Sequence, residues 1–426
     1  MIATHSTAAA ESRLILRNFG WMGGLQLAAR VLRILTIILA ARLLAPEDYG
    51  LAALVLAANE IFHVFSHGSV SSKLIQVPKA ELSACKVNVY WLSWLLCIAL
   101  TLLQMVSAYP LSQFYQQPGI VAPLLVLALS YLVLPLATVH SAMLIRNGRL
   151  NVVAKSEWLQ SVVEAILTLI LVLADFGFWA LVLPKAMVAP LWVFYIRSNY
   201  VWVLPREVCV SAWRSILGFG LPVALNDLLQ VVRVHFSALL IGKVLGVEAL
   251  GIYYFATNAG LGLSMGLIRS LNQVLFSYYC RHRHHSPCMD ENVFLRGAAV
   301  GLGVMIPLIL LQSILAPVYV PLLFGERWVN EGVVPLLILL CISALPLPLV
   351  SGAGQALRAA NRPLAELCGQ VIYVVLSITV CCLVIEWGLY GVAFAGLCVN
   401  IVYCPLFAWW VWSALRSHRQ AIRFSM

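Results

Sequence analysis

The sequence predicts an all-α integral membrane protein with about twelve transmembrane helices in two six-helix bundles. Three observations predict this fold class: the composition, the spacing of long apolar runs, and an internal repeat. Hydrophobic residues make up 62% of the 426 residues and charged residues only 10%, and the mean hydropathy is +0.93. These values exclude a soluble globular chain. Because a bilayer core about 30 Å thick needs about 20 helical residues per span, little room is left for a soluble domain.

The apolar runs define the predicted helices one after another. The predicted spans are residues 20–44, 49–69, 87–109, 120–145, 153–174, 177–198, 214–241, 249–279, 294–321, 331–357, 363–386 and 388–414. Around them lie a leader at 1–19, a linker at 199–213 between the bundles 20–198 and 214–414, and a tail at 415–426. The first run carries arginines and is too long for a cleavable signal peptide, so it is expected to be retained.

Lysine and arginine residues fall unevenly in alternate loops. Of the 27 in the chain, only Arg42, Lys243 and Arg327 fall in loops on the predicted outer side, and most of the others fall on the opposite side. By the positive-inside rule, both termini are predicted to be cytoplasmic. The net charge of +10 therefore reflects membrane topology, and nucleic-acid binding is not expected.

A polar stripe interrupts the first apolar run. Gln26, Arg30 and Arg33 fall within about 60° of one another on a helix. An arginine inside a membrane helix costs about 2.5–3.5 kcal/mol, so both arginines are expected to line a hydrated pathway for an anionic substrate. The alternative is that they pair with acids on neighbouring helices.

Ionisable residues also lie in the second, fifth and sixth spans. The second span carries Glu60, His63 and His67 on one face. A carboxylate beside two histidines is typical of a proton-coupled pathway; the alternative is a neutral histidine packed in the core. The fifth span carries Glu164, and the sixth carries Lys185 between two prolines. Helices broken by proline at membrane depth often border a binding cavity, although prolines also occur there without a function.

The second half of the chain repeats the first. Residues 39–51 align with residues 240–252, with a small residue, a cation, an apolar pair, a glutamate and a glycine in phase. The upstream stripe recurs as Asn226, Gln230 and Arg233. Six predicted spans separate the start of one copy from the start of the other. The two bundles are therefore predicted to be related by a pseudo-two-fold axis along the membrane normal.

The rest of the second half carries fewer polar groups. Asp227 accompanies Arg233, and Arg269 lies in the eighth span. The tract CRHRHHSPC at 280–288 contains metal-ligating residue types, but a basic loop beside anionic headgroups explains it more simply. No metal site and no cofactor are predicted, apart from a proton or sodium gradient. The last two spans are expected to face lipid, because Gln370, Asn400 and Tyr403 are their few mid-span polar residues.

Four short motifs resemble those of the polysaccharide (O-antigen type) lipid-linked oligosaccharide flippase family, in the multidrug/oligosaccharidyl-lipid/polysaccharide exporter superfamily. They are ARLLAPEDYGL at 41–51, AMLIRNGRL at 142–150, LIGKVLGVEALGIY at 240–253 and LFGERW at 323–328. The resemblance runs over nearly the whole chain. It implies two bundles forming a V around a central cavity, residence in the bacterial inner membrane, and a substrate built on undecaprenyl pyrophosphate.

The resemblance and the polar residues together define a candidate site. In that family, basic residues of the first and seventh helices line the cavity, and Arg30, Arg33 and Arg233 match them by position. The predicted substrate-binding set also contains Gln26, Lys185, Asn226, Gln230 and Arg269, of which Lys185 and Arg269 match no motif and are included on burial alone. The predicted ion-coupling set is Glu60, His63, Glu164 and Asp227, which balance the arginines or exchange protons or sodium.

The predicted function is a flippase, not an enzyme. It would move an undecaprenyl-pyrophosphate-linked oligosaccharide from the inner to the outer leaflet by alternating access, with the lipid bilayer and other polysaccharide-assembly proteins as further partners. A multidrug or small-molecule exporter of the same superfamily is disfavoured by the excess of in-span cations over acids. A membrane enzyme acting on lipid-linked sugars is disfavoured by short outer loops. A scaffold without transport stays open, although its buried arginines would then have no evident purpose.

Overall fold

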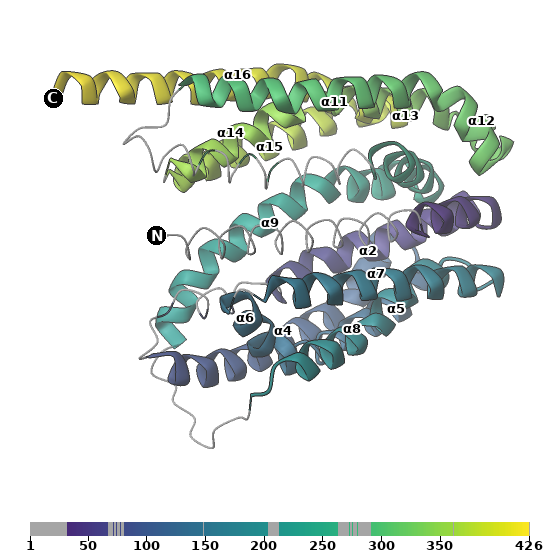
Figure 1. Ribbon diagram of the computed structural model, residues 1–426. Coiled ribbons are helices and arrows are strands. Elements are labelled where there is room, and N and C mark those ends of the chain that lie inside the picture. The colour runs from purple at the N-terminus through teal and green to yellow at the C-terminus, as the bar shows by residue number, and fades with distance from the viewer. Residues whose placement is uncertain are drawn as a thin grey trace, which may run out of the picture. The chain divides into compact units, whose positions relative to one another are not determined.

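The structure is a computed structural model that describes residues 32–66, 81–147, 149–202, 213–262, 291–360 and 362–425, together with residues 71, 74, 77, 272, 275 and 279. The described residues are helical with short connections, and no strand occurs among them (Figure 1). Seven helices in this part of the chain are long and apolar enough to cross a membrane, and one bent pair is an eighth candidate. The chain is an all-α, multi-pass membrane protein, as the composition predicts.

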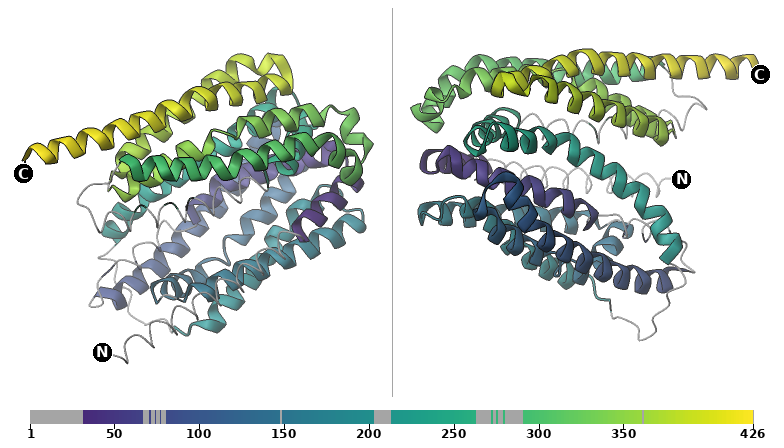
Figure 2. Two further views of the ribbon diagram at one scale, coloured as in Figure 1. Left: turned by 45° about the horizontal axis from the view of Figure 1, so that its top comes forward. Right: turned by 180° about the vertical axis from the view of Figure 1, so that it is seen from behind.

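The first compact unit contains residues 1–228. It begins, within the described residues, with a helix at 32–43. The helices that follow are α2 (Pro46–Ser66), α4 (Leu82–Tyr115), η2 (Pro118–Ile120), α5 (Val121–Ser130), α6 (Pro135–Arg146), α7 (Leu150–Leu173), α8 (Trp179–Asn199) and the first part of α9 (Trp213–Val244). Helix α7 packs along α8, and α5 packs on both α4 and α8 (Figure 2). Ile216 of α9 is buried in the cluster that α4 and α6 form, so this helix starts in unit 1.

One carboxylate holds the hinge before α2. This helix begins at Pro46, where the missing N–H of proline is not needed. The Asp48 carboxylate accepts hydrogen bonds from the backbone N–H of Ala45 (3.2 Å) and of Phe178 (3.1 Å). It therefore joins the start of α2 to the α7–α8 turn. Gly177 in that turn has a φ of +54°, and a Cβ there would lie 3.1 Å from Asp48 Oδ1, so a larger residue would be strained.

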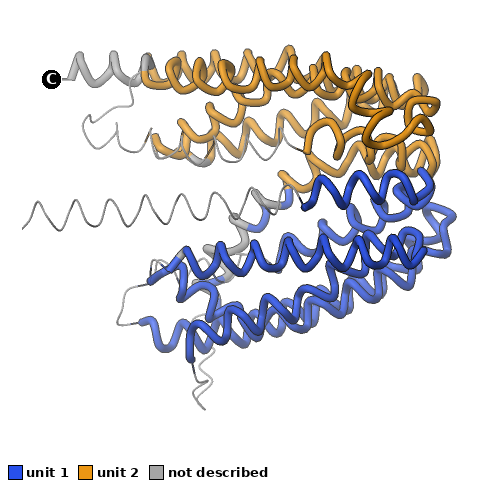
Figure 3. Tube along the Cα trace, turned by 45° about the vertical axis from the view of Figure 1, so that its right-hand side comes forward, with its two compact units in different colours: residues 1–228 blue, residues 229–426 orange. Residues whose placement is uncertain are grey.

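The second compact unit contains residues 229–426 (Figure 3). It comprises the rest of α9, a helix at 247–262, and α11 (Glu291–Tyr319), η3 (Val320–Phe324), α12 (Glu326–Asn330), α13 (Val333–Ser343), α14 (Leu347–Ala359), α15 (Pro363–Val384), η4 (Ile385–Trp387) and α16 (Gly388–Ser425). Helix α16 packs against α13, α14 and α15. Trp328 of the LFGERW motif is fully buried and stacks on Phe255, with ring centroids 3.8 Å apart. This motif thus anchors the α11–α13 connection to the helix at 247–262.

Two predicted spans contain an interruption of the helix. Helices α5 and α6 meet at an angle of 54°. Helices α13 and α14 are separated by a turn at residues 344–346, although residues 333–359 still form one candidate span. Proline accounts for both interruptions, because it lacks the N–H that would donate the next helical hydrogen bond. Pro135 begins α6, and Pro346 directly precedes α14. Both breaks carry the pattern Ser-x-Leu-x-Leu-Pro, at 130–135 and 343–348, which extends the internal repeat into the fourth span of each half.

The finer predictions about domain organisation stay predictions. The compact units divide within α9, between residues 228 and 229, whereas the sequence places the bundle boundary at the linker 199–213. Residues 203–212 of that linker lie outside the described residues. The leader, the tail, the axis between the bundles and the cytoplasmic termini are not tested either.

Candidate substrate-binding and ion-coupling groups

Part of the predicted site lies outside the described residues. Gln26, Arg30, Arg269 and the tract 280–288 belong to this part. Asn226 and Asp227 lie within α9, but their side chains are also outside the description. The site is therefore built here from Arg33, Lys185, Gln230, Arg233, Glu60, His63 and Glu164.

Arg33 carries an exposed guanidinium on the helix at 32–43. Among the described residues, none of the ion pairs involves it. Thr36, one turn later, is buried and its hydroxyl lies 3.4 Å from the carbonyl of Ala165 on α7. One side of this helix therefore packs into unit 1, and Arg33 lies outside that packed side.

Arg233 is half-buried on α9, and its guanidinium lies over the ring of Tyr373 on α15, 5.5 Å from the ring centroid. The ion pairs of the described residues do not include Arg233. Gln230, three residues earlier on the same helix, is also half-buried, so both side chains lie on one face. The positive charge of Arg233 rests on an aromatic face, which attracts a cation without neutralising it.

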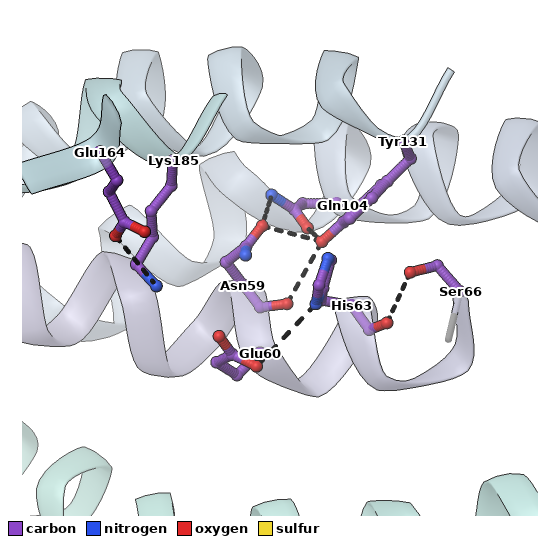
Figure 4. A network of polar contacts seen from close by, with 8 residues as sticks. All are labelled: Asn59, Glu60, His63, Ser66, Gln104, Tyr131, Glu164 and Lys185. Carbon is purple, nitrogen blue, oxygen red and sulfur yellow. Dashed lines mark hydrogen bonds and ion pairs between the residues drawn. The ribbon is translucent and has the colours of Figure 1, made fainter. Parts of the chain in front are cut away.

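Lys185 and Glu164 face each other. The Lys185 ammonium on α8 lies 4.0 Å from the Glu164 carboxylate on α7, and both side chains are about one-third exposed or less (Figure 4). The sequence assigned the lysine to substrate binding and the glutamate to ion coupling. The structure brings them together as an ion pair, so each offsets the charge of the other.

Glu60 and His63 also lie together, one turn apart on α2. Their closest atoms, Glu60 Oε2 and His63 Nδ1, are 4.0 Å apart, and both side chains are partly exposed. The imidazole ring packs against Tyr131, with ring centroids 5.8 Å apart (Figure 4). The titratable pair on α2 is thus in contact with the break between α5 and α6, where Tyr131 lies.

A buried polar network stabilises that break. The Gln104 amide on α4 donates to Asn59 Oδ1 on α2 (3.2 Å) and to the Leu124 carbonyl on α5 (2.9 Å). Tyr131 Oη lies 2.8 Å from Asn59 Oδ1 and 2.7 Å from Gln104 Oε1. Thr101 on α4 adds a hydroxyl bond to the Ala128 carbonyl near the end of α5 (3.2 Å). Side chains of α4 therefore add hydrogen bonds to carbonyls of α5 and hold this bent helix pair against α4.

A second network lies at the break between α13 and α14. The Tyr373 hydroxyl donates to Asn400 Oδ1 (2.6 Å), and Asn400 Nδ2 donates to the Ser343 carbonyl at the end of α13 (2.7 Å). Tyr403 donates to the Gly369 carbonyl on α15 (2.5 Å). Asn400 and Tyr403 are buried. These few polar side chains of the last two spans join α13, α15 and α16 inside unit 2.

The comparisons with known proteins agree with this architecture. A family model described as "Polysaccharide biosynthesis protein" matches residues 38–332, which is more than half of the chain. The chain belongs to this polysaccharide biosynthesis family. The resemblance recognised in the sequence motifs is confirmed at this level.

Curated relatives of this polysaccharide biosynthesis protein are distant. An amylovoran biosynthesis protein of Erwinia amylovora is 24% identical over 324 residues, covering 75% of this chain and 83% of the relative. A lipopolysaccharide biosynthesis protein of Escherichia coli strain K12 is 23% identical over 333 residues, covering 76% of this chain and 65% of the relative.

Two solved structures are similar in fold. A lipid II flippase in an inward closed conformation has a TM-score of 0.78 at 14% identity, covering 91% of this chain and 86% of the flippase. An inward-facing multidrug transporter of the same superfamily has a TM-score of 0.71 at 16% identity, covering 91% of this chain and 96% of the transporter. At these identities the likeness establishes the transporter fold of the superfamily alone.

Sequence reasoning missed most of the residues at the two breaks. Asn59, Gln104, Tyr131 and Tyr373 were not singled out as site residues. A signal was present for the first two, because an amide in the middle of an apolar span is costly unless it is hydrogen-bonded. The tyrosines gave no such signal. Their position beside an interruption of a helix becomes apparent only once the structure shows where the helices are interrupted.

Proposed function

We propose that this polysaccharide biosynthesis protein is a flippase for lipid-linked oligosaccharides in the bacterial inner membrane. The substrate would be a glycan on undecaprenyl pyrophosphate, moved from the inner to the outer leaflet by alternating access and driven by an ion gradient. Family membership and the transporter fold support this proposal. The observation that carries it is the contrast between neutralised and unneutralised cations in the predicted spans.

Within the predicted spans, one described cation is neutralised by a carboxylate: Lys185 lies 4.0 Å from Glu164. Arg33 and Arg233 have no such partner among the described residues. Keeping an arginine charged within a membrane segment is costly, so these two guanidinium groups favour a negatively charged ligand.

A pyrophosphate meets this requirement. Its charge does not cross hydrocarbon without a compensating partner. Guanidinium groups bind phosphate oxygens through two parallel hydrogen bonds and stay charged throughout a transport cycle. In this proposal Arg30, Arg33, Arg233 and Arg269 bind the pyrophosphate with help from Gln26, Asn226 and Gln230. Lys185, in contrast, serves the ion pair with Glu164.

The coupling part of the proposal assigns ion exchange to acidic residues and a histidine. Glu60 and His63 are partly exposed and close together, which suits groups that gain and lose a proton. Glu164 and Asp227 would offset nearby arginine or lysine charge when the substrate site is empty. No cofactor other than the ion gradient is proposed, and other polysaccharide-assembly proteins would supply and receive the glycan.

Binding of undecaprenyl pyrophosphate tests this proposal. The purified full chain in nanodiscs would be titrated with this lipid and, separately, with undecaprenyl monophosphate, and binding followed by native mass spectrometry. We expect Arg233→Ala to weaken pyrophosphate binding about 10- to 100-fold, because a hydrogen bond to a charged group contributes about 1.5–3 kcal/mol. Arg33→Ala should weaken it in the same direction.

Arg296→Ala is the matched control. Arg296 is an exposed arginine near the start of the predicted span 294–321, on α11. It belongs to neither predicted site, so its removal should leave binding unchanged. Equal pyrophosphate affinity in the wild type, Arg33→Ala and Arg233→Ala would overturn the proposal. Binding of a cationic drug in place of the pyrophosphate would favour the multidrug exporter.

A further inference from the structure

Arg233 carries its positive charge against an aromatic ring. Its guanidinium carbon lies 5.5 Å from the ring centroid of Tyr373, a residue of α15 in the same compact unit. The face of an aromatic ring attracts a cation through its quadrupole but does not neutralise it. A carboxylate, in contrast, would accept the N–H hydrogen bonds with which an arginine binds oxyanions. The ring therefore holds Arg233 and leaves its charge for another partner.

A second arginine of unit 2 is held differently. Arg358 Nε lies 2.6 Å from Glu366 Oε2, and the Glu366 side chain is only 8% exposed. That carboxylate neutralises the guanidinium and joins the end of α14 to the start of α15. Arg233 takes part in none of the ion pairs of the described residues. The contact of Arg233 with a ring thus suits a different task from that of a structural ion pair.

Two contacts fix the Tyr373 ring. Its hydroxyl donates to Asn400 Oδ1 at 2.6 Å, which holds the far end of the side chain. The Tyr403 ring lies beside it, with centroids 5.2 Å apart and an interplanar angle of 61°, a favourable arrangement for an aromatic pair. The hydroxyl and the ring are held by different side chains, which restricts rotation of the ring.

These two supporting side chains are themselves buried and hydrogen-bonded. Asn400 is 6% exposed and donates to the Ser343 carbonyl at the end of α13 (2.7 Å). Tyr403 is 9% exposed and donates to the Gly369 carbonyl on α15 (2.5 Å). The ring that contacts Arg233 is therefore supported by side chains bound to the backbone of two helices. Such support is what keeps a binding group in one geometry.

We propose that Tyr373 is a positioning residue, which holds Arg233 charged and oriented for a phosphate group of the lipid-linked substrate. This inference rests on the proposed function, in which Arg233 binds the pyrophosphate. A free arginine side chain loses rotational freedom when it binds, and this loss weakens binding. Because Tyr373 restricts Arg233 before the phosphate arrives, less freedom is left to lose. The ring also has no oxyanion that competes with the phosphate.

A double-mutant cycle tests the positioning role. The full chain in nanodiscs would be titrated with undecaprenyl pyrophosphate, and binding followed by native mass spectrometry, in the wild type, Tyr373→Leu, Arg233→Ala and the combined variant. We expect Tyr373→Leu to weaken binding about 3- to 10-fold, the range of a cation–π contact. In the Arg233→Ala background the same substitution should have no further effect, because the ring acts through the guanidinium. Equal losses in both backgrounds, or no loss in Tyr373→Leu, would overturn the proposal.

Ring electronics separate the cation–π contact from packing. Tyr373→Phe keeps the aromatic face but loses the hydrogen bond to Asn400. A ring-fluorinated phenylalanine at position 373 keeps nearly the same shape, but fluorine withdraws electron density from the face. The fluorinated variant should therefore bind the lipid about 3- to 10-fold more weakly than Tyr373→Phe. This comparison stays valid if Tyr373→Leu does not fold, and equal affinity of the two aromatic variants would contradict the positioning role.

Tyr390→Leu is the matched control. Tyr390 also lies in unit 2, and its hydroxyl donates to the Gly332 carbonyl at 2.8 Å. The cation–π contacts of the described residues do not include its ring. Its replacement should leave lipid binding unchanged. A loss as large as that of Tyr373→Leu would show that removing a tyrosine of unit 2 is enough to weaken binding, against a specific role for Tyr373.

The two proposals fail in different ways. Equal lipid affinity in Arg233→Ala and the wild type would remove the flippase proposal and the positioning role with it. Weaker binding in Arg233→Ala, together with additive losses in the combined variant, would leave the flippase proposal in place and remove the role of Tyr373 alone.

Discussion

The two broken helices solve the same problem in different ways. At the α13–α14 break, each donor meets one acceptor: Tyr373 donates to Asn400, and Asn400 donates to the Ser343 carbonyl. A permanent cation, Arg233, lies over the Tyr373 ring. At the α5–α6 break, three oxygens lie 2.7–3.2 Å from the Tyr131 hydroxyl. The hydrogen bonds described for this hydroxyl do not involve an arginine or a lysine.

This difference shows how related halves acquire different roles. A balanced network with a fixed guanidinium holds its charge through a transport cycle and suits the binding of an anion. The network around Tyr131 consists of neutral groups and links α2 and α4 to the bend between α5 and α6. The two breaks share the Ser-x-Leu-x-Leu-Pro pattern, so the residues that the neighbouring helices supply account for the difference. Three pairs of substitutions rank the expected effects at the two breaks.

The largest effect is expected from removing the tyrosine at the unit 1 break. Tyr131→Ala deletes a fully buried aromatic side chain, and such deletions cost about 3–5 kcal/mol of unfolding free energy. Tyr373→Ala should cost less, because Tyr373 is only partly buried. The Tm of each variant in detergent measures the difference. A larger loss for Tyr373→Ala would reverse the comparison.

An intermediate effect is expected from truncating the asparagines. Asn400→Ala leaves the Tyr373 hydroxyl and the Ser343 carbonyl without their partner and should cost about 1–3 kcal/mol. Asn59→Ala removes the acceptor of the buried Gln104 amide and should cost a similar amount. Chemical unfolding of both variants measures these costs, and a cost for either variant above that of Tyr131→Ala would contradict the ranking.

The smallest effect is expected from the hydroxyl groups next to the breaks. Thr101→Val removes the bond from α4 to the Ala128 carbonyl and should cost about 1 kcal/mol. Ser343→Ala removes a bond to Leu340 within the same helix and should cost less than Thr101→Val. Hydrogen exchange at residues 128–134 should rise in Thr101→Val alone. Faster exchange there in Ser343→Ala would indicate that the two breaks are not independent.

Individual residues show where sequence reasoning succeeded. The motif ARLLAPEDYGL at 41–51 was singled out from the sequence. The structure adds that its Asp48 accepts hydrogen bonds from Ala45, before α2, and from Phe178 in the α7–α8 turn. The sequence repeat also pointed to Arg33 and Arg233. In the structure, the ion pairs of the described residues include neither of these arginines. These features are local or repeat along the chain, so spacing alone is enough to find them.

Other features show what spacing along the chain did not provide. Lys185 and Glu164 were assigned separate roles, and the ion pair between them was not foreseen. The bend of 54° within the predicted span 120–145 was not foreseen either, because the hydropathy stays high through Pro135. The hydrogen bonds that bury Asn400 between helices gave no signal in the sequence. Each of these features depends on which face of one helix meets another.

Composition and the length of apolar runs determined by themselves that this is a multi-pass helical membrane protein, because the cost of placing polar groups in hydrocarbon is paid residue by residue. The internal repeat likewise needed only the order of residues. Tertiary structure alone decided which cations are neutralised and how the two breaks are hydrogen-bonded. Those outcomes depend on contacts between residues such as Asn59 and Gln104, far apart in the chain, and no local pattern specifies which helices will meet.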